Sequence, residues 1–148
     1  MTHPPGPAPD DSPSAPLLAL GEIALRTENL DGMVAFYRDV VGLEPIEVAE
    51  TPAFFTLGES ARGHAAVFVL FDRTGTDDYT GPDQQRTTLD HLAFTVDLDA
   101  FDSEAERLEA EGLDLTFASH DWVQWRSLYF DDPDGNHVEF VCFQSREA

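Results

Sequence analysis

Three polar side chains on predicted strands are the first candidates for chemistry. Glu139 interrupts a strand-like run, 137–143, whose other members are mostly apolar. Glu22 and His91 lie in two further runs, each on the strand face opposite the larger apolar residues. One imidazole and two carboxylates that converge on a cavity would suit a divalent metal ion. The alternative, which spacing alone leaves open, is that each side chain lies on a solvent-facing strand surface.

A strong turn precedes Glu139 and fixes the register of its strand. Pro133 pre-sets one backbone dihedral angle, and Gly135 supplies a positive φ. The flanking runs are rich in aromatic and β-branched residues, which favours strands on both sides. Residues 128–141 therefore predict a strand, a tight turn and a second strand, and this register decides which side chains face inward.

The rest of the chain contains one pattern twice. A strand over 21–27 is followed by a helix that begins at Asn29 or Asp31 and ends at Gly42, and then by strands at 44–49, 53–57 and 64–71. The pattern restarts with a strand at 90–96, a helix capped by Asp99 and ended by Gly112, and strands at 115–118, 124–130 and 137–143. Residues 21–25 align with 90–94 at a constant offset of 69 residues, so Glu22 is the counterpart of His91.

This order predicts an α+β fold of two tandem βαβββ modules that form a curved mixed sheet, or half-barrel, around a cavity. We expect a disordered tail over 1–16, a first module over 17–72, a polar connector over 73–88 and a second module over 89–148. Each module alone is too small for a good core, so the two should pack together as one compact domain. Pairing of the modules within one chain and pairing across two chains both stay open.

The charge balance is strongly acidic. The 148 residues include 29 Asp and Glu against 8 Arg and no Lys, which gives a formal net charge of -21 at pH 7. Such a surface repels nucleic acid and anionic membranes, so we expect neither as a partner. Acidic, lysine-free surfaces suit high salt, where screening relieves the self-repulsion, and this favours a salt-adapted source.

The sequence also predicts a cytoplasmic protein. No apolar run is long enough to cross a bilayer, and the N-terminus lacks the basic and apolar regions of a secretory signal. The single cysteine, Cys142, cannot form an internal disulfide and is expected as a small buried residue in a strand. A reducing compartment is consistent with this cysteine usage.

Three segments carry a family resemblance: Phe36-Tyr37-Arg38-Asp39-Val40-Val41-Gly42-Leu43, Leu89-Asp90-His91-Leu92-Ala93-Phe94, and Tyr129 through Glu139. Together with the paired modules they resemble the vicinal oxygen chelate superfamily. That superfamily includes glyoxalase I, extradiol ring-cleavage dioxygenases, fosfomycin-resistance enzymes and bleomycin-resistance proteins. The likeness covers nearly everything from Leu20 to Phe143 and is more specific for the fold than for the reaction, because this fold hosts many chemistries.

The resemblance implies metal ligands on the first and last strands of each module. By that mapping Glu22, His91 and Glu139 fall on ligand positions, whereas the fourth position falls near Val69, which cannot ligate. Glyoxalase I enzymes use four protein ligands, and the dioxygenases use three, two His and one Glu. The set in this chain departs from both, and it implies a divalent Fe, Mn, Ni or Zn ion without resolving which.

A second likeness is to the ring-cleavage dioxygenase signature. His120, then seven residues, Leu128-Tyr129, Asp132-Pro133, Gly135 and Glu139 follow that signature, and Ala118 breaks it at the first position. The likeness implies that His120 is an acid/base candidate and that Tyr129 donates a hydrogen bond to a bound oxygen. The alternatives are an exposed loop position for His120 and a core position for Tyr129. Trp122 and Trp125 would either wall a planar substrate or serve in packing or a dimer contact.

These observations favour a metal-dependent enzyme of the glyoxalase/dioxygenase type. It would bind a small-molecule substrate through two neighbouring oxygens, with a leaning towards ring-cleavage chemistry. A glyoxalase-like isomerase or lyase is one alternative. A non-catalytic, bleomycin-resistance-type protein that sequesters a small molecule is another. We expect a homodimer, since module sheets in this superfamily often associate.

Overall fold

The structure, a computed structural model, describes residues 16–144, so nearly all of the predicted tail over 1–16 lies outside the described residues. The first module contains β1 (Glu22–Thr27), α1 (Leu30–Ala35), the π-helical turn η1 (Phe36–Val41), β2 (Glu44–Val48), β3 (Pro52–Glu59) and β4 (Ala65–Asp72). The second module contains β5 (His91–Thr95), α2 (Leu98–Ala110), β6 (Thr116–His120), β7 (Trp125–Asp131) and β8 (His137–Phe143). The predicted α+β fold of two βαβββ modules is confirmed.

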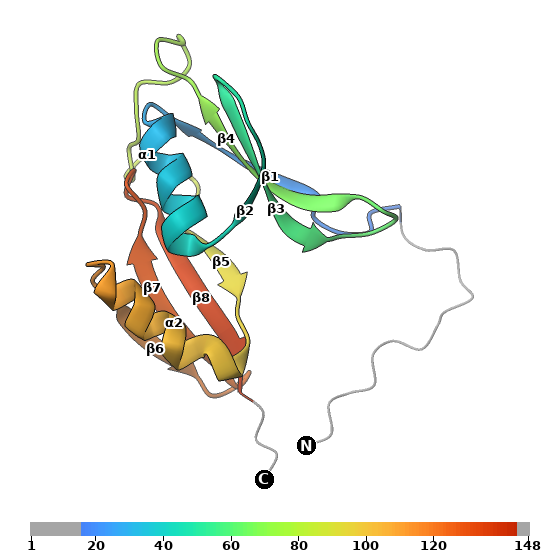
Figure 1. Cartoon of the computed structure of the whole chain (residues 1–148), viewed down its shortest axis with the longest axis vertical. Helices are drawn as coiled ribbons and strands as arrows, with labels where there is room; N and C mark the ends of the chain where they lie inside the picture. The colour runs from blue at the N-terminus through green and yellow to red at the C-terminus, as the bar shows by residue number, and fades with distance from the viewer. Residues whose placement is uncertain (1–15, 145–148) are drawn as a thin grey trace.

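Each module has its own four-stranded mixed sheet. The strand orders are β1-β4-β3-β2 and β5-β8-β7-β6, with the first strand of each module parallel to the last. Figure 1 shows α2 lying across one face of the second sheet and α1 lying between that module and β1. Strands β1 and β5 are edge strands. Within residues 16–144 no other strand pairs with their outer edges, so these edges are open to a further strand.

Helix boundaries follow local chemistry with one correction. The Asn29 side chain accepts a 3.2 Å hydrogen bond from the Gly32 amide and caps α1, as predicted. Gly42 ends η1 at φ 92°, a left-handed conformation that favours glycine. The prediction that Asp99 caps the second helix is wrong. Asp97 holds the N-cap position, and Asp99 lies in the first turn, where its charge still complements the helix dipole.

One hydrophobic core joins the two modules. Phe68 of β4 packs against Phe94 of β5, with ring centroids 6.4 Å apart, and Phe36 of the first helical segment packs against Phe130 of β7 at 6.0 Å. Tyr37 is fully buried and lies 4.5 Å from the Phe68 ring centre. The helix-facing sides of both sheets therefore share one core. The opposite faces of the sheets do not belong to this core and can carry a site.

The turn between β7 and β8 is built around the Asp132 carboxylate. Asp132 Oδ1 accepts hydrogen bonds of 2.9 Å from the amides of Asp134 and Asn136. Asp132 Oδ2 accepts a 2.9 Å bond from Asn136 Nδ2 and a 2.6 Å bond from the Tyr37 hydroxyl. Gly135 adopts a positive φ of 83°. This network fixes the register of β8 and ties the turn to the first module.

Candidate metal centre

His91 and Glu139 meet on the face of the second sheet opposite α2. His91 Nε2 lies 3.2 Å from Glu139 Oε1, with the Glu139 side chain only 8% exposed and the His91 side chain 39% exposed. β5 and β8 pair in parallel, and Glu139 is in register with Ala93, two residues after His91. The pairing therefore brings together two side chains that are distant in sequence, and the histidine side is reached from solvent.

Outer contacts orient both head groups. His91 Nδ1 lies 2.6 Å from Asp90 Oδ1, and in a neutral ring that donates a hydrogen bond to this carboxylate the proton is on Nδ1. Ser127 Oγ donates a 3.0 Å hydrogen bond to Glu139 Oε2. In a neutral imidazole, Nε2 and Oε1 then face each other as two electron-rich atoms. A shared metal ion or proton would stabilise that arrangement.

Glu22 is not part of this pair within one chain. It is exposed on β1 in the first sheet, in register with Val67. Among residues 16–144, no three His, Cys, Asp or Glu side chains lie close enough together to hold a metal ion. Val69, at the fourth mapped position, is buried and offers no donor atom.

Tyr129 and His120 lie beside the pair on the same sheet face. Tyr129 is in register with Glu139, and its hydroxyl lies 3.5 Å from His120 Nε2. Burial and then the charge of Glu139 raise the pKa of Tyr129, so its hydroxyl stays protonated. His120 is the last residue of β6 and is half-buried, and so it is not a loop residue.

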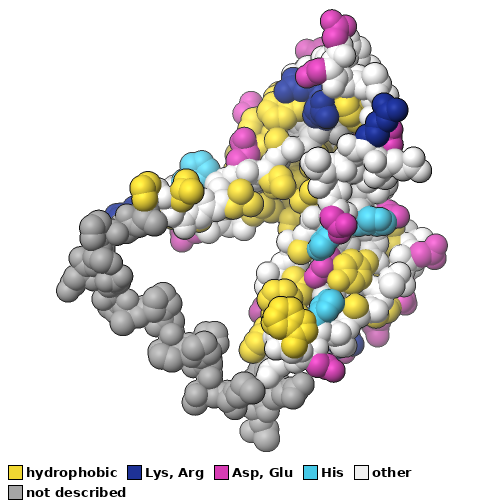
Figure 2. All heavy atoms as spheres, turned by 180° about the vertical axis from the view of Figure 1, so that it is seen from behind, with side chains coloured by type: hydrophobic (Ala, Val, Ile, Leu, Met, Phe, Trp, Pro, Cys, Tyr) yellow, Lys and Arg dark blue, Asp and Glu magenta, His cyan; other side chains and the backbone are white. Residues whose placement is uncertain are grey.

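Aromatic side chains flank this face at the far end of the sheet. Trp125 is in register with Phe143, and the two side chains are 46% and 54% exposed. Trp122, in the loop before β7, is 85% exposed. Figure 2 views the molecule from behind, and on the second module His and acidic side chains lie among apolar ones. Cys142 points to the opposite side and is buried, as predicted.

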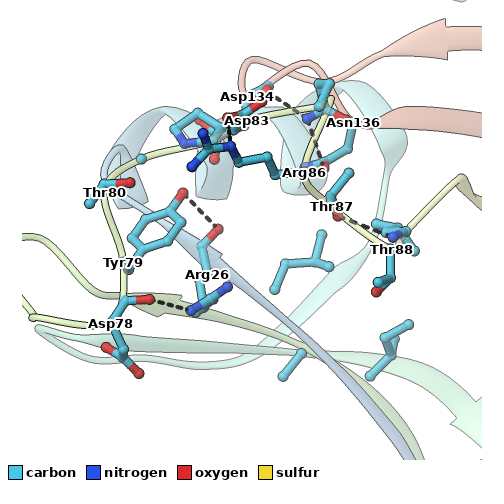
Figure 3. Close-up of a pocket in the computed structure, with 17 residues that line it drawn as sticks. Arg26, Asp78, Tyr79, Thr80, Asp83, Arg86, Thr87, Thr88, Asp134 and Asn136 are labelled. Atoms are coloured by element: carbon cyan, nitrogen blue, oxygen red, sulfur yellow. Dashed lines mark hydrogen bonds and ion pairs between the residues drawn. The ribbon is translucent and has the colours of Figure 1, made fainter.

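A second feature, a cavity of about 540 Å³, lies where β1, the connector and the β7–β8 turn meet. Its lining includes Arg26 and Arg86, shown with Tyr79 in Figure 3. Arg26 Nη1 donates a 2.9 Å hydrogen bond to the Asp78 carbonyl, and its guanidinium lies 4.9 Å from the Tyr79 ring centre. Burial first, then the charges of Asp134 and Glu28, raise the pKa of Tyr79.

Arg26 was not among the predicted site residues, although the alternation of residues along β1 indicated it. Glu22, Ala24 and Arg26 alternate along β1, so all three lie on one strand face. A rise of about 3.3 Å per residue puts the Arg26 backbone roughly 13 Å along the strand from Glu22. The cavity could not be foreseen, because a connector of irregular structure forms most of its wall.

Comparison with known proteins agrees with this architecture. The sequence profile of the Glyoxalase/Bleomycin resistance protein/Dioxygenase superfamily matches residues 19–140. The chain belongs to this superfamily. The superfamily match covers both modules, including His91 and Glu139. None of the helices within residues 16–144 is long and apolar enough to cross a membrane.

Relatives within the superfamily are enzymes of more than one kind. Glutathione transferase FosA of Serratia marcescens is 28% identical over 123 residues, covering 83% of this chain and 79% of that protein. Lactoylglutathione lyase of Haemophilus influenzae is 29% identical over 130 residues, covering 84% and 92%. The crystal structure of lactoylglutathione lyase from Agrobacterium tumefaciens superposes with a TM-score of 0.67 at 27% identity, covering 86% of this chain and 96% of that chain.

Proposed function

We propose that this protein is a metal-dependent enzyme of the vicinal oxygen chelate type, active as a homodimer on a small substrate. The observation that carries the proposal is the contact between His91 Nε2 and Glu139 Oε1. Asp90 contacts Nδ1 of His91, and Ser127 contacts Oε2 of Glu139. The other nitrogen and the other oxygen, which could bind a metal, face each other. A nitrogen and a carboxylate oxygen of this kind suit Mn²⁺, Fe²⁺, Ni²⁺ or Zn²⁺.

The third ligand in this proposal is Glu22 of a second copy. The two sheets of one chain are separate, and β1 and β5 are both edge strands. Because Glu22 and His91 are equivalent positions of the repeated module, pairing β1 of one copy with β5 of the other would bring them side by side. Each dimer would then contain two equivalent sites, and a single chain would contain none.

The residues of the second sheet have distinct roles in this proposal. A bound divalent ion would act as a Lewis acid towards two neighbouring substrate oxygens. Tyr129 donates a hydrogen bond from its protonated hydroxyl to a substrate oxygen. His120, within reach of that hydroxyl, accepts or returns a proton at Nε2. Trp125 and Phe143 exclude water from the apolar part of the substrate.

An anionic substrate group is favoured by the cavity next to β1. The described residues on the site face of the second sheet include no Arg, since Arg126 turns to the other face, onto Asp102 and the Phe101 ring. Arg26 and Arg86 line the cavity beside β1 and carry guanidinium groups there. Glutathione, which appears in the names of two relatives, carries carboxylates of the required charge.

These features favour two reaction classes. Proton transfer on a thiol conjugate, as in a lyase or isomerase, is favoured by the arginines of the cavity. Ring cleavage is favoured by the adjacent His120 and Tyr129. Oxygen consumption with a catechol as substrate indicates ring cleavage, whereas turnover of a glutathione hemithioacetal without oxygen uptake indicates a lyase.

The metal centre is tested by binding of Mn²⁺ to the purified protein, measured by equilibrium dialysis. Replacing a ligand in His91→Ala or Glu139→Ala should weaken binding by more than the roughly 10–100-fold typical of outer contacts. Glu109→Ala is a matched control, because this residue is exposed on α2, outside the site, and this variant should bind normally. Wild-type affinity in Glu139→Ala would contradict the assignment. Absence of metal binding in the wild type, together with stabilisation by a small organic ligand, would favour a sequestering protein instead.

A further inference from the structure

The Ser127 side chain is a buried hydroxyl that contacts the Glu139 carboxylate. It lies on β7 with no exposed surface and donates from Oγ to Glu139 Oε2 at 3.0 Å. Ser127 is in register with Val141, so it stands diagonally across from Glu139 on the same sheet face. The diagonal is long for a small side chain, and contact requires the carboxylate to lean towards β7.

The two oxygens of Glu139 thus have different partners on opposite sides. Oε2 receives the Ser127 proton, whereas Oε1 faces His91 Nε2 at 3.2 Å. A carboxylate on a flexible side chain has a broad terminal torsion, so nothing in the Glu139 side chain itself selects this orientation. The serine hydroxyl does select it, because rotating the carboxylate away would break a buried, charge-assisted hydrogen bond.

We propose that Ser127 is a positioning residue that turns Oε1 of Glu139 towards His91 and so pre-forms the metal centre. This inference rests on the proposed function, since it requires Glu139 to be a ligand. Preformed ligands bind a metal more tightly because less ordering is needed on binding. The carboxylate is held from behind by Ser127 as the imidazole is held by Asp90, so both ligands are oriented before an ion arrives.

The test is the dissociation constant for Mn²⁺, measured from the EPR signal of the free ion, in variants at this position. Ser127→Ala should weaken binding about 10–100-fold, the range typical of an outer partner of a ligand. Ser127→Cys keeps a side chain of similar shape with a poor donor and should show a similar loss. Ser127→Thr keeps the hydroxyl and should restore most of the affinity. Ser119→Ala, on the neighbouring strand at an exposed position, is the control and should bind as the wild type does.

The outcomes separate this inference from the proposed function. If the wild type binds no Mn²⁺, or Glu139→Ala binds it normally, the metal centre itself fails. If Glu139→Ala loses the metal but Ser127→Ala keeps wild-type affinity, the centre stands and the positioning role is overturned. Urea unfolding of the metal-free variants measures their stability against that of the wild type, and so separates a loss of metal affinity from a loss of folding. Equal losses of affinity in Ser127→Ala and Ser127→Thr would also overturn the role of the hydroxyl.

Discussion

The hydroxyl of Tyr37 links the first module to the turn that orients Glu139. It donates a 2.6 Å hydrogen bond to Asp132 Oδ2, and both side chains are buried. Tyr37→Phe should lower the free energy of unfolding by about 1.5–3 kcal/mol, because it leaves a charged acceptor short of a donor. Urea denaturation measures this loss. Tyr79→Phe is the control, since the Tyr79 hydroxyl makes only a 3.5 Å exposed contact, and a similar loss there would contradict the explanation.

The same hydroxyl predicts a dependence on alkaline pH. Burial, followed by the charge and hydrogen bond of Asp132, raises the pKa of Tyr37 far above its ordinary value. Above about pH 10 the unfolded chain therefore releases a proton that the folded protein keeps, and stability should fall by roughly 1.4 kcal/mol per pH unit for this group. Below pH 10 this contribution is fully present. Tyr37→Phe should show a shallower decline between pH 10 and 11 in thermal unfolding, and an identical decline would contradict the assignment.

At the scale of elements, the β7–β8 turn is the structure on which the site depends. Asp132→Ala removes the acceptor of four hydrogen bonds, two of them from backbone amides. We expect a loss of about 3 kcal/mol or more, since buried donors are left unpaired. Asp83→Ala is a matched control, because Asp83 also accepts from a backbone amide two residues on, but in an exposed turn. Calorimetry of both variants should separate them by several degrees in Tm.

The helices and strands could be predicted well from the sequence, and the site only in part. Alternation singled out His91 and Glu139 as polar positions on their strands, and parallel pairing of β5 with β8 brings these two side chains into contact, whereas Tyr129 was indicated by the dioxygenase-like signature. Asp97 replaced Asp99 as the N-cap because the two aspartates lie two residues apart and an aspartate at either position can start a helix. The Arg26 cavity was missed because an irregular connector carries no periodic signal. The separation of the two sheets within one chain also has no local signature, since the same modules can pair in either way.

At the scale of the whole molecule, we expect net charge to be the main electrostatic influence on stability. A charge of -21 on 148 residues favours expansion, and the described ion pairs are mostly exposed and worth little. Raising the salt concentration from low to molar should raise Tm, because screening weakens the repulsion between carboxylates. Differential scanning calorimetry in NaCl and in an osmotically matched sucrose series measures the effect. A Tm independent of salt would contradict a charge-limited stability.

The metal centre shared between two copies is tested most directly by mixing two variants, neither of which should bind the metal alone. Glu22→Ala and Glu139→Ala should each bind no Mn²⁺ at the site when pure. After joint unfolding and refolding in equal amounts, mixed dimers would contain one site with both substitutions and one with neither. Random pairing should therefore restore about one quarter of the wild-type Mn²⁺ sites. Restored high-affinity binding near that level is the predicted result, and a mixture that binds no more Mn²⁺ than the separate variants would contradict a centre shared between two copies.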